Sequence, residues 1–179
     1  MGLRWTARSN SLETFKVLQT TQVAYPSNPS YLSHTATQRS GVFLRFKMST
    51  IKVYVAISDD GGVYKHWALF LDEPEADETL LNARGSDGRF RYETEKRDVR
   101  HDQSLVELVY LCSVDVAKAN MIRDIARSIP VHNEISGWNC QDYVLDLLDE
   151  LEVRRVMGSE DEVYRMQRTF IAGKQEGLA

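Results

Sequence analysis

The hydrophobic pattern changes its period close to residue 115, and this change constrains the fold more than any other feature of the chain. Residues 51–58 (IKVYVAIS) alternate and are rich in β-branched side chains, which is typical of a strand. Similar segments continue to residue 114, whereas apolar residues recur at helical spacing from residue 116 onward. Strands followed by helices predict an α+β fold, in which helices pack on an antiparallel sheet.

Four further strands are expected before the helices begin. The turn DDGG pairs the first strand with residues 63–71, and the turn GSDG pairs residues 79–85 with residues 89–95. Residues 104–114 are apolar enough to form a buried strand.

Three helices are expected in the second half, each with a start or stop signal. The expected N-caps are Asp115, Asn139 and Ser159, the last in a capping-box pattern with Glu162, and the expected stops are Pro130 and Gly173.

The composition is that of one domain preceded by an N-terminal extension. The 179 residues are 42% hydrophobic, which suits one core, and we place the domain at residues 48–175. Residues 1–47 hold six basic residues and one acidic residue among many Ser and Thr. This composition fits a disordered or dispensable tail, an organellar presequence, or an extension ahead of a natural start at Met48. We expect a cytoplasmic protein, or a mitochondrial one if residues 1–47 are a presequence.

The remainder of the chain excludes several classes of protein. The other 16 basic and 25 acidic residues give it a net charge of −9, which opposes nucleic-acid binding. No run approaches the roughly 18 apolar residues of a membrane helix, so we expect a soluble protein with no membrane partner. Two cysteines suit neither a disulfide framework nor a structural zinc site. No pattern in the sequence indicates an oligomeric state.

One of these cysteines, Cys140, occupies a position that favours a nucleophile. Asn139 is a good N-cap and Asp142 suits the first turn, so Cys140 falls at about the first helical position. Backbone amides and the helix dipole there lower a thiol pKa below ~8.5, and the Cys140 amide can donate to an oxyanion. The alternative is that Cys140 is a small buried residue where the helix packs. Cys112, inside an apolar strand, is expected to be core.

A nucleophile requires a base, and His66 is the preferred histidine. It interrupts an apolar strand, between Tyr64 and Trp67, where pairing with Cys140 would account for its presence. Packing within the sheet is the alternative role for His66. The other histidines lie in the tail or in polar stretches, at positions 34, 101 and 132.

Three more residues complete the predicted site. Asn82 is the expected orienting residue for the imidazole, with a structural role near a turn as the alternative. Trp67 and Trp138 flank the proposed pair in sequence and are candidate walls of a substrate cleft, although aromatic residues near a core often only pack.

The segments HWALFL (66–71) and NCQDYV (139–144) also carry a resemblance. A His in an early strand, a polar residue on the next strand, and a Cys at the start of a late helix resemble the circularly permuted papain-like superfamily. This superfamily includes lecithin-retinol acyltransferase-like proteins and permuted deubiquitinase-like peptidases. The resemblance covers residues 51–153 in outline, and fungal proteins of this type are the most similar in appearance.

The resemblance implies a permuted papain-like fold and a thiol hydrolase or acyltransferase without metal or organic cofactor. Cys140 would attack a peptide, amide or acyl-type carbonyl, His66 would act as base and then acid, and Asn82 would orient His66. Lecithin-retinol acyltransferase-like proteins carry a second His where this chain has Asn82, and a C-terminal membrane anchor that is missing here, so lipid acyl transfer is disfavoured. The alternative is a noncatalytic module of the same fold that binds a partner through the cleft.

Overall fold

The computed structural model describes residues 49–73, 78–158 and 160–177, which all belong to one compact unit, Leu44–Ala179. The predictions for residues 1–47 and for Ser159 therefore concern residues outside the described part of the chain. The strands are β1 (Thr50–Ser58), β2 (His66–Asp72), β3 (Thr79–Arg84), β4 (Arg91–Lys96) and β5 (Leu105–Asp115). The helices are the short 3₁₀ turns η1 (Val99–His101) and η2 (Val116–Lys118), then α1 (Ala119–Ser128), α2 (Cys140–Val153) and α3 (Glu162–Ala172).

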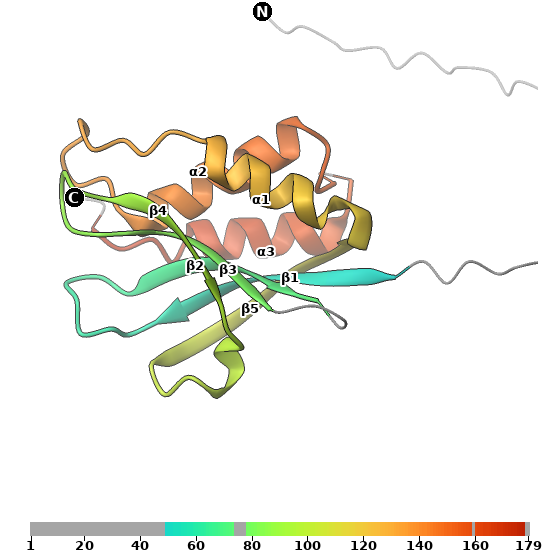
Figure 1. The fold of residues 1–179 in the computed structure, drawn as a ribbon, viewed down its shortest axis with the longest axis horizontal. Helices are drawn as coiled ribbons and strands as arrows, with labels where there is room; N and C mark the ends of the chain where they lie inside the picture. The colour runs from blue at the N-terminus through green and yellow to red at the C-terminus, as the bar shows by residue number, and fades with distance from the viewer. Residues whose placement is uncertain (1–48, 74–77, 159, 178–179) are drawn as a thin grey trace, which may run out of the picture. The chain divides into compact units, whose positions relative to one another are not determined.

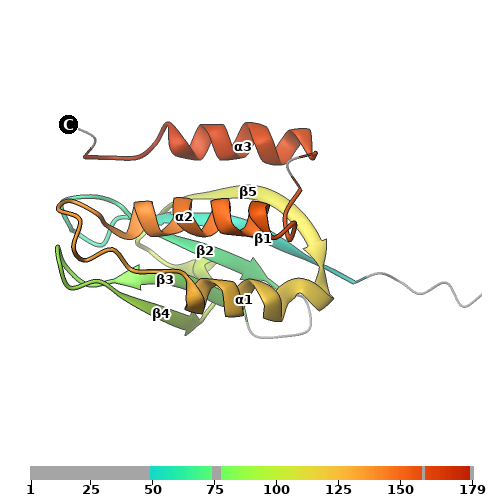
Figure 2. The same ribbon diagram turned by 90° about the horizontal axis from the view of Figure 1, so that it is seen from above.

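The five strands form one antiparallel sheet in the order β4-β3-β2-β1-β5. The three α-helices lie on one face of this sheet, as Figures 1 and 2 show. Alternate residues of the strands face the helices, and they build the main core with the apolar sides of α1, α2 and α3. The α+β fold predicted from the change of period is confirmed.

The other face of the sheet carries a second, smaller core. Its buried members are Ala56, Ala68, Phe70, Leu80 and Val99. Val99 belongs to η1, so the connection between β4 and β5 covers this face with one short helical turn. The sheet is therefore apolar on both faces at its centre, which explains why β2 has a continuous run of five buried residues after His66.

Strand β5 differs from its prediction as a buried strand. It lies at the edge of the sheet, beside β1 alone, and several of its side chains are exposed or half-buried. Its pairing with β1 shifts register twice, between Val53 and Tyr54 and between Ile57 and Ser58. The strand is apolar because one of its faces packs against α3 and the other packs beside Tyr54, not because it is buried between two strands.

The helix starts follow local cap chemistry, with two departures from the predicted boundaries. The Asp115 side chain accepts a hydrogen bond from the Ala117 amide as predicted, but it caps η2, and α1 follows one turn later. The cap of α3 is Asp161, whose carboxylate accepts from the amides of Val163 and Tyr164. A carboxylate satisfies two free amides there, which explains why the helix begins at Glu162 rather than two residues earlier.

The hairpin turn after β1 is also longer than the predicted turn at residues 59–62. Residues 59–65 connect β1 to β2, and the Asp59 side chain accepts from the Gly61 amide at 3.0 Å. This connection moves the start of β2 to His66, so the histidine opens the strand instead of lying in its middle.

Among the described residues, no helix is long and apolar enough to cross a membrane.

Candidate active site

Helix α2 begins after the predicted N-cap, Asn139, which forms a complete capping box with Asp142. The Asn139 side chain accepts from the Gln141 amide at 2.8 Å, and the Asp142 carboxylate accepts from the Asn139 amide at 2.8 Å. These two bonds satisfy amides that the first turn of a helix leaves unpaired. Cys140 is therefore fixed as the first residue of α2.

The Cys140 sulfur lies against the backbone at the start of β2. Its thiol faces the Lys65 carbonyl, with an Sγ–O distance of 4.0 Å, and the Trp67 amide donates a hydrogen bond toward the sulfur. These two residues flank His66 in the chain, so the nucleophile candidate is packed against the peptide groups that carry the candidate base. The side chain is 7% exposed.

The environment of the thiol corrects the sequence prediction of a lowered pKa. Burial raises the pKa of Cys140, and this effect outweighs the lowering by the amides of Trp67 and Cys140 itself. Asp142 raises the pKa further because its negative charge opposes a thiolate. The resting form at neutral pH is therefore the thiol, and a base must remove its proton before Cys140 can react.

The structure brings the predicted pair His66 and Asn82 together through a side-chain hydrogen bond. The distance from His66 Nε2 to Asn82 Oδ1 is 3.2 Å, and Asn82 Nδ2 donates to the Glu93 carbonyl at 3.3 Å. Because the second bond turns the amide oxygen toward the ring, Nε2 must be the protonated nitrogen. Nδ1 is then the basic nitrogen of a neutral His66.

The position of this pair explains why two polar groups are tolerated beside the core. The ladder between β2 and β3 pairs residues 69–71 with residues 79–81 and goes no further. His66 and Asn82 lie just beyond it, and their side chains link the two strands where the backbones no longer pair. Asn82 is completely buried, so its two hydrogen bonds are needed to offset the cost of burying an amide.

Burial also lowers the pKa of His66, and the nearby Arg84 guanidinium lowers it further. Asp60 and the hydrogen bond that His66 donates to Asn82 act in the opposite direction but are weaker. The imidazole is therefore neutral at pH 7, which is the form that accepts a proton.

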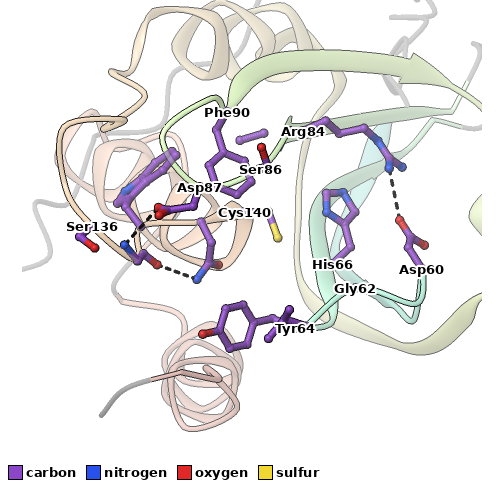
Figure 3. Close-up of a pocket in the computed structure, with 16 residues that line it drawn as sticks. Asp60, Gly62, Tyr64, His66, Arg84, Ser86, Asp87, Phe90, Ser136 and Cys140 are labelled. Carbon is purple, nitrogen blue, oxygen red and sulfur yellow. Dashed lines mark hydrogen bonds and ion pairs between the residues drawn. The ribbon is translucent and has the colours of Figure 1, made fainter.

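His66 and Cys140 line the same cavity, which has a volume of about 640 Å³. Figure 3 shows the sulfur directed from the start of α2 toward the side on which the His66 ring lies. Three other segments complete the wall: residues 60–64 after β1, residues 83–87 at the end of β3, and residues 136–139 before α2. A volume of this size suits a small molecule or a few residues of a peptide.

The structure separates the two predicted tryptophan walls. Trp138 lines the cavity and packs edge-on against Phe90, with ring centres 5.8 Å apart. Trp67 is 1% exposed, belongs to the main core, and is not among the described residues that line this cavity. Trp67 points to the helix side of the sheet because strand side chains alternate, so only Trp138 is placed to contact a ligand here.

Arg84 and Phe90 are cavity residues that the sequence analysis did not single out. The Arg84 guanidinium pairs with Asp60 at 3.2 Å and with Glu95 at 2.8 Å, so its charge is already balanced. Phe90 supplies an apolar side wall. The sequence signal for both was their place on either side of the turn GSDG, since that turn reaches the end of the sheet where His66 lies.

Gly85 gives a test of the cavity wall that does not touch the predicted catalytic residues. Its φ is +147°, and a Cβ added there would lie 2.4 Å from the Arg89 carbonyl oxygen. We expect Gly85→Ala to displace the turn after β3 and to change ligand access to Cys140. Gly158→Ala is the matched control, because its Cβ would meet nothing closer than 3.9 Å. Equal rates of Cys140 alkylation in the two variants and the wild type would contradict this expectation.

Cys112 is a core residue, as predicted. It is buried among the apolar side chains of the main core, and burial raises its pKa to about 11. Cys112 therefore serves as an internal control for any reaction at Cys140. Among the described residues, no group of three or more His, Cys, Asp or Glu side chains is arranged to hold a metal ion.

Comparison with known proteins identifies a family for this chain. Residues 53–158, more than half of the chain, match a family of unknown function (DUF6540). The chain belongs to this family. The matched region contains His66, Asn82 and Cys140, whereas α3 and the residues after it lie outside the match. No curated protein and no solved structure shows significant similarity to the chain.

Proposed function

We propose that this protein is a cysteine-dependent hydrolase or acyltransferase that acts on a peptide, amide, ester or thioester through Cys140 and His66. One observation carries the proposal: an imidazole oriented by a buried amide lines the same cavity as a thiol at the start of a helix. The resemblance to the permuted papain-like superfamily supports the same chemistry.

In this proposal, the first half of the reaction acylates Cys140. His66 Nδ1 accepts the thiol proton while Sγ bonds to the substrate carbonyl carbon, and the carbonyl electron pair moves to oxygen. The tetrahedral intermediate then collapses, and the leaving amine, alcohol or thiol departs with the proton from His66. Asn82 keeps Nε2 protonated throughout, so Nδ1 is the nitrogen that gains and loses the proton.

The second half releases the acyl group from the thioester. His66 removes a proton from water, or from an acceptor alcohol or amine, which attacks the thioester carbonyl. Collapse of the second intermediate breaks the S–C bond and returns the proton to Sγ. The Cys140 backbone amide, the first of α2, is the proposed donor to both oxyanions, since no described acceptor other than its own sulfur pairs with it.

The resting state of the site dictates one requirement of this mechanism. The thiol contacts the Lys65 carbonyl and not the His66 ring in the described structure, and both partners are neutral. The proposed mechanism therefore requires the sulfur to move from the Lys65 carbonyl to Nδ1 when substrate enters. Catalytic hydrogen bonds that tighten only in the substrate complex are common.

The same observation favours a second candidate function. A thiol with a raised pKa that contacts a carbonyl oxygen instead of a base suits a noncatalytic module that binds a ligand in the cavity. In that case Cys140 would be a buried structural residue, and a reactive ester would leave it unmodified.

Acylation by p-nitrophenyl acetate, followed by intact-mass and peptide mass spectrometry, separates the two candidates. We expect one acetyl group on Cys140 in the wild type, none on Cys112, and none in Cys140→Ala. An unmodified protein, or equal modification of both cysteines, would refute the proposed chemistry and support the binding module.

A further inference from the structure

The buried side chain of Gln141 links the residue after Cys140 to the residue before His66. Its Nε2 donates to the Lys65 carbonyl at 2.9 Å and to the Glu176 carboxylate at 3.3 Å. Its Oε1 accepts from the Glu176 amide at 2.7 Å. Gln141 is completely buried, so these three bonds fix its position rather than exchange with water.

Glu176 repeats this link from the other side. One carboxylate oxygen accepts from the Lys65 amide at 2.7 Å, and the other pairs with the Lys65 ammonium at 2.5 Å. The hydrogen bonds that the Lys65 ammonium and amide donate lower the pKa of Glu176, so the carboxylate is ionised at neutral pH. A single residue near the end of the chain therefore holds both backbone polar groups next to His66, one directly and one through Gln141.

The neighbours of Glu176 extend this arrangement to the helix cap and to the cavity wall. Gln175 donates to the Asp142 carboxylate at 2.6 Å, and Asp142 belongs to the capping box of α2. A Cβ added to Gly177 would lie 2.8 Å from the ring of Tyr64, so the chain passes directly against this cavity residue.

We propose that Glu176 and Gln141 are positioning residues that fix the start of β2 against the start of α2, and thereby keep His66 and Cys140 in the relative position from which proton transfer can occur once substrate enters. This inference rests on the proposed function. It assigns a catalytic consequence to a segment that lies outside the family match at residues 53–158.

The contacts favour a role in geometry over a role in stability. The Lys65–Glu176 ion pair is partly exposed on both sides, and such pairs contribute little to folding. Glu176→Ala should therefore remain folded. Loss of the Glu176 carboxylate would remove the hydrogen-bond acceptor of the Lys65 amide and one acceptor of Gln141 Nε2. A misplacement of about 1 Å at a reacting pair can lower a rate by roughly 10²-fold.

The experiment compares the pH dependence of Cys140 acylation by p-nitrophenyl acetate in the wild type, Glu176→Ala, Glu176→Gln and His66→Ala. Glu150→Ala is the matched control, because it removes a carboxylate of α2 whose 2.6 Å ion pair with Arg154 is remote from the site. We expect Glu176→Ala to react about 10²-fold more slowly at pH 7 and to lose most of the rate increase that accompanies His66 deprotonation. Glu176→Gln, which retains an acceptor for the Lys65 amide, should recover part of the rate.

The possible results separate this inference from the function on which it rests. The positioning role alone would be overturned if the pH profile of Glu176→Ala matched that of the wild type while the profile of His66→Ala differed from both. Identical profiles in the wild type and His66→Ala would overturn both proposals. A rate loss in Glu150→Ala equal to that in Glu176→Ala would show a general effect of lost surface charge and would also overturn the positioning role.

Discussion

Replacement of His66 by alanine should slow the acylation of Cys140 by roughly 10²- to 10⁴-fold at pH 7, the range that general-base catalysis supplies. The reason is the state of the thiol: burial raises its pKa, so few molecules carry a thiolate at neutral pH. Without an imidazole to accept the proton, the reaction depends on that small fraction. Stopped-flow measurement of p-nitrophenol release checks the rate.

Two other variants distinguish loss of the base from general damage to the site. Asn82→Ala leaves the imidazole in place but removes the bond that selects its tautomer, so we expect a smaller loss than in His66→Ala. His101→Ala removes an exposed histidine of η1 that pairs with Asp98, and it should retain the wild-type rate. If His66→Ala also retained that rate, His66 would have no part in the reaction.

Replacement of Trp67 by alanine should lower the free energy of unfolding by about 3–5 kcal/mol, as for other large buried aromatic residues. Trp67 is 1% exposed and packs in the main core between the sheet and the helices, so its removal leaves a large cavity. Guanidinium denaturation followed by far-UV circular dichroism measures the change, since the signal does not depend on tryptophan fluorescence.

The matched control for Trp67 is Met166 on α3, which is 65% exposed. Met166→Ala should change the free energy of unfolding by no more than about 0.5 kcal/mol. Trp67 was also a candidate wall of the substrate cleft from sequence. A Trp67→Ala protein of unchanged stability with weakened ligand binding would restore that assignment and contradict the core position.

The parts of the fold that depend on local pattern were predictable from the sequence. The alternation of residues 51–58, the turn GSDG and the Asn139 cap each involve residues close together in the chain, and the structure has each of them as expected. The edge position of β5 was not predictable in this way. An edge strand and a central strand can have the same hydrophobic pattern. They differ in their pairing with strands distant in the chain, which the pattern does not report.

The candidate site shows the same division. Helix capping placed Cys140, and the position of a polar residue just before an apolar run singled out His66, because both signals are local. The raised pKa of the Cys140 thiol was not predictable from local sequence. It comes from burial of the thiol against the start of β2, which is distant in the chain from α2. The link from Glu176 to Lys65 spans 111 residues and has no sequence motif.

The most direct test of the account is the pH dependence of Cys140 alkylation by iodoacetamide, measured in the wild type and in His66→Ala. Burial lowers the pKa of His66, so the wild-type rate should rise as the imidazole loses its proton below pH ~6.5, and rise again when the thiol itself ionises well above neutral pH. His66→Ala should lack the first rise and keep the second. A single rise at high pH in both proteins would contradict proton transfer from Cys140 to His66.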